Sequence, residues 1–300
     1  MKKIFACILC LILLCGCATK SEGGGRLQIV TTVFPIYDFV RAVAGDTADI
    51  KMLIKPGSEV HAFEPAPSDM AVISECDLFA FIGGESDSWV ENILADTKVN
   101  RVALIERVET LEEEASHGDG HLHHHTHDEH IWTSPRNAED MINSICEELC
   151  KLRPESASFY RENAIRYIEE IDVAASEIKA AVAESEWGFI VVADRFPFKY
   201  FTDYFGIEYE AALDGCAAAG DVSVKTVARL LSVINERQIK AVYCTELSNR
   251  VIANAIAEQT GAQIIELHSA HNVTLKDFNG GTSYADVLRR NAKAIRKGIK

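Results

Sequence analysis

The chain has 300 residues, of which 48% are hydrophobic and 8% aromatic, a composition that supports a sizeable folded core. Its formal net charge of -15 excludes the basic surface that nucleic-acid binding requires, so we expect no nucleic-acid partner. The length suits one large or two medium domains.

Residues 1–16 predict a signal peptide, because two lysines precede an apolar run over 4–14 that is too short to span a bilayer. The run ends in L-C-G-C, which resembles the bacterial lipobox. That resemblance implies a mature chain that starts at a lipidated Cys17, with a Gly/Ser-rich tether over 17–26. An uncleaved membrane anchor is the alternative, and either would place the folded part outside the cytoplasm, at the cell membrane.

Residues 27–153 alternate between strand and helix patterns. Continuous β-branched and apolar runs predict buried parallel strands, and the segments of helical spacing between them predict helices on both faces of a sheet. We therefore expect a first α/β lobe, with strands at 27–34, 49–54, 77–82 and 101–105, and helices at 36–44, 89–94 and 138–153.

A long helix is predicted over 154–186, where apolar residues recur at helical spacing without an internal Pro or Gly. About thirty residues at 1.5 Å rise give a rod of roughly 45 Å. A coiled-coil dimer is one interpretation of such a helix, although its heptad pattern is not strict.

Residues 187–300 repeat the alternation of the first part. This pattern predicts a second α/β lobe with a parallel sheet flanked by helices. Its expected strands are 189–193, 207–212, 241–245 and 263–267, and its expected helices are 199–205, 222–238, 249–260 and 284–299.

Seven of the ten histidines lie between His117 and Pro135, which indicates a metal site because imidazole is a common ligand of borderline metals. The loop 115–129 has no helix or strand period and suits a flexible, metal-collecting segment. An internal tag or a functionless polar loop would be the alternatives. The loop histidines are His117, His121, His123, His124, His125 and His127.

Two other histidines are placed more rigidly. His130 is followed by I-W-T-S-P, an apolar and then helix-capping sequence that belongs to ordered chain. His61 lies in a proline-rich loop directly after a strand, at the edge of a parallel sheet where ligands bind. Both are candidates for direct metal contact.

The segments H-A-F-E-P-A-P-S-D-M and H-I-W-T-S-P resemble two signatures of the metal-specific solute-binding proteins of bacterial zinc and manganese ABC importers. The resemblance implies that His61 and His130 are ligands. It also implies that one long backbone helix joins the two lobes and limits hinge motion, and that the His-rich insertion marks a zinc-specific member.

The second lobe departs from that family pattern. A third His is usual at the end of its first strand, where this chain has Asp194 beside Arg195, which could neutralise it. An acid is usual after a later strand, where His268 stands, with His271 in reserve. We expect His268 and Asp194 to complete the site and Glu246 to orient a histidine.

Three imidazoles with a carboxylate or water suit Zn²⁺, whereas Mn²⁺ would favour more oxygen ligands. By the resemblance, we expect a monomeric, lipid-anchored, non-enzymatic receptor that binds Zn²⁺ and delivers it to an ABC importer permease. A manganese receptor is the first alternative. A zinc hydrolase with Glu64 as general base is the second, although no H-E-x-x-H phrase is present, and a surface adhesin is the third.

The cysteines after Cys17 are odd in number and show no paired C-x-x-C, so no disulfide framework follows from them. Cys146 and Cys150 fit small buried side chains on one helix. Cys216 and Cys244 could pair or stay free.

Overall fold

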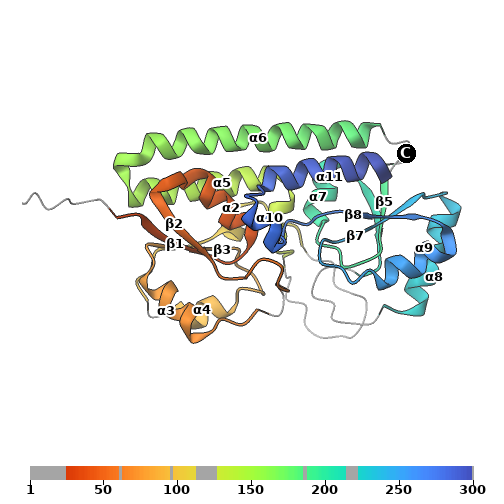
Figure 1. Cartoon of the computed structure of the whole chain (residues 1–300), viewed down its shortest axis with the longest axis horizontal. Helices are drawn as coiled ribbons and strands as arrows, with labels where there is room; N and C mark the ends of the chain where they lie inside the picture. The colour runs from red at the N-terminus through yellow and green to blue at the C-terminus, as the bar shows by residue number, and fades with distance from the viewer. Residues whose placement is uncertain are drawn as a thin grey trace, which may run out of the picture.

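The computed structural model describes residues 25–60, 63–94, 97–112, 127–184, 188–213 and 222–298. Two lobes lie next to each other beneath a layer of helices (Figure 1). Each lobe is built on a four-stranded parallel sheet.

The first sheet has the strand order β2-β1-β3-β4. Its central strands β1 and β3 are buried because their residues are almost all apolar, which is the pattern of a sheet covered on both faces. The elements of this lobe are β1 (Leu27–Thr31), α2 (Phe34–Ala44), β2 (Ala48–Met52), α3 (Pro67–Glu75), β3 (Leu78–Phe81), α4 (Trp89–Leu94) and β4 (Arg101–Ala103).

The second sheet repeats this arrangement with the order β6-β5-β7-β8. In both sheets the chain reverses its direction of travel between the two central strands, so loops diverge at their carboxyl ends and leave a crevice there. The elements are β5 (Phe189–Val192), α7 (Lys199–Phe205), β6 (Glu208–Ala211), α8 (Val224–Glu236), β7 (Ala241–Cys244), α9 (Val251–Thr260), β8 (Gln263–Glu266) and α10 (Leu275–Asn279).

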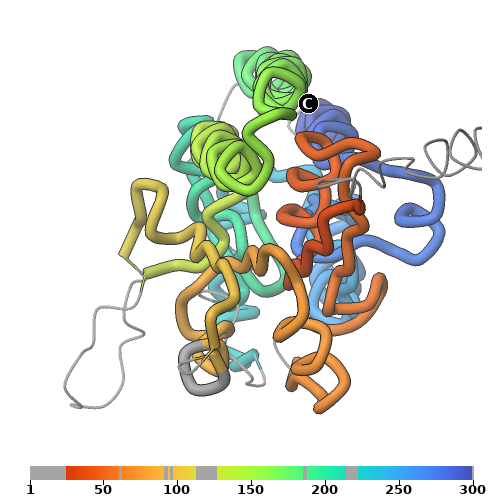
Figure 2. The backbone as a smooth tube through the Cα atoms, turned by 90° about the vertical axis from the view of Figure 1, so that its left-hand side faces the viewer, coloured from red at the N-terminus to blue at the C-terminus, as the bar shows by residue number. Residues whose placement is uncertain are grey.

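Three long helices, α5 (Pro135–Leu152), α6 (Ala157–Ala183) and α11 (Tyr284–Gly298), form the layer above the sheets (Figures 1 and 2). Ser134 caps α5 by accepting a hydrogen bond from the N–H of Asn137. With 27 residues, α6 is about 40 Å long and runs over both lobes (Figure 1). The fold class expected from the sequence is confirmed: two α/β lobes with parallel sheets, and one long helix that connects them.

The hydrophobic core beneath α6 is continuous between the lobes. It includes Ile171 and Ile178 of α6 itself, Phe39 of the first lobe and Phe201 of the second. Two smaller cores lie on the opposite faces of the sheets, one under α3 and α4 and one under α8 and α9. The lobes therefore share most of one core and keep a separate core each.

Asp38 links three helices where the lobes meet. This buried carboxylate accepts hydrogen bonds from the Tyr284 N–H at 2.7 Å and from the hydroxyl of Tyr167, and it pairs with Arg41. Burial raises the pKa of Asp38, and the charge of Arg41 and the donated hydrogen bonds oppose that rise. The network ties α2, α6 and α11 together.

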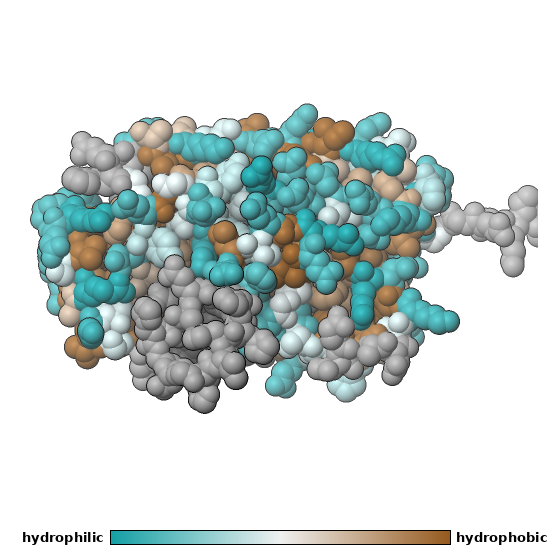
Figure 3. All heavy atoms as spheres, turned by 180° about the vertical axis from the view of Figure 1, so that it is seen from behind, coloured by the Kyte–Doolittle hydropathy of each residue, from teal (hydrophilic) through white to brown (hydrophobic). Residues whose placement is uncertain are grey.

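Hydrophilic side chains cover most of the described surface visible on the rear face of the molecule, with apolar atoms among them (Figure 3). In the part of the chain that the structure describes, no helix combines the length and the apolar character needed to cross a membrane.

Candidate metal site

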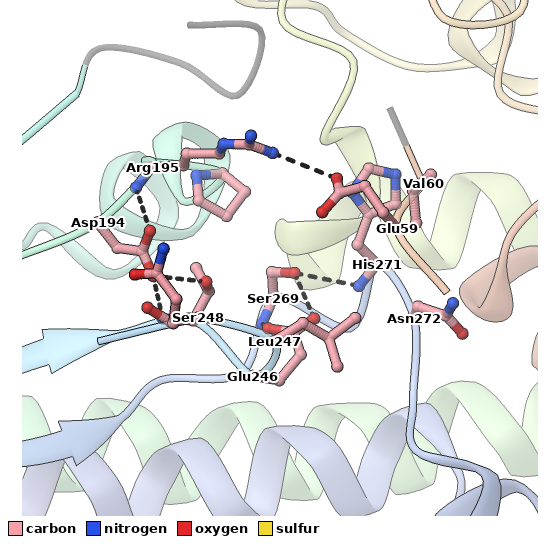
Figure 4. A pocket seen from close by; sticks show the side chains of 13 residues that line it. Glu59, Val60, Asp194, Arg195, Glu246, Leu247, Ser248, Ser269, His271 and Asn272 are labelled. Atoms are coloured by element: carbon pink, nitrogen blue, oxygen red, sulfur yellow. Dashed lines mark hydrogen bonds and ion pairs between the residues drawn. The ribbon is translucent and has the colours of Figure 1, made fainter. Parts of the chain in front are cut away.

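A pocket of about 220 Å³ lies between the lobes at the carboxyl ends of the strands (Figure 4). The first lobe contributes Glu59 and Val60. The second lobe contributes loops after β5, β7 and β8, which bring Asp194, Glu246 and His271 to the wall. This is the position at which parallel α/β sheets bind ligands.

His130 is held in a fixed orientation next to this pocket. It is 5% exposed, and its Nδ1 lies 3.0 Å from Oδ1 of Asp128, which also accepts the His130 backbone N–H at 2.8 Å. Burial would raise the pKa of Asp128, but the hydrogen bonds and charge of His130 outweigh burial and lower it. A carboxylate on Nδ1 is the usual partner of a histidine that binds metal through Nε2.

The segment before His130 is anchored by a tight turn after β3. Glu129 Oε1 accepts the N–H of Ser86 at 2.7 Å. Gly84 has φ +94°, and a Cβ placed on it would lie 2.8 Å from Glu129 Oε1, so only glycine allows this approach.

In the same turn, burial raises the pKa of Asp87 to about 7, and the charge of Glu129 adds to the rise. Asp87 accepts the N–H of Gly83 at 3.1 Å.

His271 meets His130 from the other lobe. The two imidazoles are arranged edge to face with ring centroids 5.1 Å apart, and the ring of His271 lies 4.8 Å from Trp132. Trp132 itself crosses between the lobes, because its indole N–H donates to the Ser269 carbonyl at 2.8 Å. The structure therefore brings together imidazoles that are 141 positions apart in the sequence.

His268, the ligand expected from the sequence in preference to His271, points away from the pocket. Its Nδ1 accepts the N–H of Ala270 at 3.0 Å, and its ring lines a separate cavity of about 10 Å³ among Phe198, Phe201 and other core side chains. That volume corresponds to about one water molecule and leaves no room for a hydrated ion. Ala270 has φ +61°, so the chain turns sharply between the two histidines and directs them to different sides.

Asp194 lines the pocket, but its carboxylate already accepts three hydrogen bonds. Oδ1 accepts the N–H of Arg195 at 2.9 Å, and Oδ2 accepts the hydroxyl and the N–H of Thr245 at 2.8 and 3.2 Å. The sequence suggested that the Arg195 guanidinium could neutralise Asp194, but in the structure the guanidinium pairs with a different carboxylate. It reaches across the pocket to Glu59 Oε1 at 3.2 Å (Figure 4).

Glu246 is committed to the loop after β8. Its two oxygens accept the Ser269 N–H at 2.9 Å and the Ser269 hydroxyl at 2.7 Å, and Oε1 lies 3.5 Å from Nδ1 of His268. The carboxylate thus fixes the turn that presents His271, which is an orienting role.

Asn272, next to His271, joins the two lobes. Its side-chain amide donates to the carbonyls of Lys55 and Ser58 at 2.9 Å each. Those two residues form the turn that leads to Val60 on the pocket wall and then to His61. His61 itself lies outside the described residues.

Several other expected residues lie away from the pocket or outside the described chain. His127 is exposed at the base of the His-rich loop, in a bridge with Glu112, and Glu64 is exposed beyond the pocket wall. Cys244 is buried and free, and so is Cys146, while Cys150 is partly buried. Outside the described residues lie Cys17, His117, His121, His123, His124, His125 and Cys216.

The candidates expected from the sequence do not include Glu59, Asp128 or Asn272. Asp128 and Glu59 each precede a candidate histidine by two positions, a spacing at which side chains of extended chain share one side. Asn272 carried no comparable signal, because its partners are 217 and 214 residues away.

Two α/β lobes under one long helix, with imidazoles converging between them, define a metal-specific solute-binding protein. The chain belongs to the family described as "Zinc-uptake complex component A periplasmic", whose profile matches residues 29–298.

Relatives with curated names agree with this family. The chain is 28% identical over 99% of its length to a protein of Streptococcus pneumoniae named "Zinc-binding lipoprotein AdcA", of which it covers 61%. It is 24% identical to the "High-affinity zinc uptake system protein ZnuA" of Bacillus subtilis, with coverage of 99% and 97% of the two chains. The chain thus spans about three fifths of the first of these relatives and nearly all of the second.

A solved structure matches the fold. The crystal structure of the Zn(II)-bound ZnuA-like domain of Streptococcus pneumoniae AdcA superposes with a TM-score of 0.76 at 25% identity, covering 92% of this chain and 99% of that one.

Proposed function

We propose that this protein is an extracytoplasmic receptor that captures Zn²⁺ between its lobes and delivers it to the permease of an ABC importer. The observation that carries the proposal is the contact between His130 and His271, whose rings come from opposite lobes and lie 5.1 Å apart. Neutral imidazole nitrogens are preferred ligands of Zn²⁺. The zinc-binding names of the relatives support the same ion over Mn²⁺.

The proposed ligand set is His61, His130 and His271. His61 is proposed from its place in the sequence, because it directly follows Val60, which lines the pocket. We assign His271 in place of His268 because His271 lines the pocket, whereas the ring of His268 faces a small cavity among core side chains. Asp194 and Glu246 hold the loops around the ion through their hydrogen bonds to Thr245 and Ser269.

The protein would act without making or breaking a covalent bond. We further propose that it works as a monomer held at the membrane by a lipid on Cys17, and that the His-rich loop gathers zinc for the pocket. The names of its lipoprotein relatives support the anchor.

Zinc titration against a competing chelator tests this function. We expect one tight Zn²⁺ site, weaker Mn²⁺ binding, and a loss of the tight site in His130→Ala and His271→Ala. His268→Ala is the matched control, because its ring is as buried as that of His130 and lies in the same loop as His271, but faces the core. If His268→Ala abolished tight binding and His271→Ala preserved it, the assignment would be wrong.

A further inference from the structure

The ion pair between Glu59 and Arg195 spans the proposed metal pocket. Glu59 comes from the loop of the first lobe that leads to His61, and Arg195 follows β5 in the second lobe. Their charged atoms lie 3.2 Å apart across the pocket, and both residues line it (Figure 4). The pair therefore crosses the pocket in which we propose that the ion binds.

Arg195 is an unusual neighbour for a divalent cation. Among the described residues that line the pocket, it alone carries a permanent positive charge. A guanidinium that stayed in place would repel an incoming cation. The repulsion would fall if the ion took the carboxylate and the guanidinium moved away.

The other carboxylates of the pocket are already engaged. Asp194 accepts three hydrogen bonds from Arg195 and Thr245, and Glu246 accepts two from Ser269. Glu59 differs, because its described side-chain partner is a charge and not a structural turn. It is the acidic group that a metal ion could recruit with the least disturbance of the loops.

The pair is also easily exchanged. The side chains of Glu59 and Arg195 are 55% and 35% exposed, and ion pairs that water reaches contribute little net stability. A bound Zn²⁺ offers a carboxylate a direct metal–oxygen bond at about 2.0–2.2 Å, beside the imidazoles of His130 and His271.

We propose that Arg195 competes with the metal ion for the carboxylate of Glu59. In the metal-free protein its guanidinium holds Glu59, and on metal entry Glu59 transfers to the ion as the acidic ligand while Arg195 turns outward. This inference rests on the proposed function of the pocket. It gives the protein a lower affinity than its ligands alone would provide, which favours release of the ion.

Chelator competition with Zn²⁺ on the metal-stripped protein tests the exchange. Arg195→Gln should tighten Zn²⁺ binding by about tenfold, because an opposed charge is removed from a pocket that is partly open to water. Glu59→Gln should weaken binding, and in the double variant the gain from Arg195→Gln should vanish, because the arginine acts through the carboxylate. Arg26→Gln is the matched control, since it breaks a comparably exposed pair with Asp49 at the amino-terminal end of the strands of the first sheet, away from the pocket.

Cobalt provides a readout of the ligand itself. The visible absorption of Co²⁺ bound to the protein should change in Glu59→Gln and not in Arg26→Gln. Weaker or unchanged zinc binding in Arg195→Gln, or an unchanged cobalt spectrum in Glu59→Gln, would overturn the exchange and leave the zinc receptor standing. A wild-type protein without a tight zinc site would overturn both.

Discussion

Asp128 accepts two hydrogen bonds from His130, one from its backbone N–H at 2.8 Å and one from its ring at Nδ1, 3.0 Å away. This double contact fixes both the position of the residue and the rotation of its imidazole. It leaves Nε2 as the nitrogen for the proposed metal.

Asp128→Asn should therefore weaken zinc binding by roughly 10- to 100-fold, the usual effect of removing the carboxylate behind a metal-binding histidine. Chelator competition measures the change. Asp286→Asn serves as the control, because Asp286 caps α11 through Ser283, away from the pocket. Equal zinc affinity in Asp128→Asn and wild type would show that this contact does not support the site.

Gly84→Ala should reduce both stability and zinc affinity. The residue combines φ +94° with a Cβ position 2.8 Å from Glu129 Oε1, so alanine would strain the backbone and push away the segment that carries His130. We expect a loss of about 1–3 kcal/mol in the free energy of unfolding. Gly261→Ala has a similar φ, +72°, and no atom within 4 Å of its Cβ position. That control should lose stability without losing zinc affinity.

Asp87 should make the protein less stable as the pH rises. Its pKa of about 7 in the folded state lies above the usual value near 4, so the folded state binds this proton more tightly than the unfolded state does. Its contribution is complete below about pH 4 and is lost as the pH rises to about 7, with a slope of at most about 1.4 kcal/mol per pH unit. Denaturant unfolding across this range should show the slope in wild type and not in Asp87→Asn.

Asp277 provides the control of opposite sign for that experiment. Hydrogen bonding to Arg290 helps to lower its pKa to about 2, so its contribution is present above the unfolded value near 4 and is lost below it. Asp277→Asn should change the stability profile at the acid end and leave the region from pH 5 to 8 unchanged. If both variants had the same profile, the assignment of the slope to Asp87 would be wrong.

Deleting residues 117–126 should lower the number of zinc ions bound and keep the tight site. The deleted histidines belong to the His-rich loop, whereas His130 is held by Asp128 and Trp132 by Ser269, outside the deletion. Calorimetric titration separates the tight event from the weaker ones. Loss of the tight event would mean that the loop supplies a ligand to the pocket itself.

Local sequence patterns predicted most of the fold. The strands around Leu27–Thr31 and Gln263–Glu266 were expected from their β-branched and apolar residues, although the structure ends each of them before the expected residue. The first of these strands ends early because helix α2 already begins at Phe34. Helix α10 (Leu275–Asn279) was not predicted, because five residues are too few to show a helical period.

The site could be predicted only where its signals are local. His130 is marked by the capped helix that follows it. The choice between His268 and His271 depends on the left-handed backbone of Ala270, a conformation that an alanine in a sequence does not announce. The contact of Arg195 with Glu59 joins residues 136 positions apart, which a single sequence cannot reveal.

The core that the lobes share beneath α6 has a mechanical consequence. Swinging the lobes apart as rigid bodies would expose side chains such as Ile178 and Phe201 to water and break the bonds of buried Asp38 to Tyr167 and Tyr284. Moving the strand-end loops alone would break fewer contacts, because Asn272 makes two hydrogen bonds to the first lobe and Trp132 makes one to Ser269. In the proposed function, we therefore expect the ion to leave through a movement of those loops, with the shared core undisturbed.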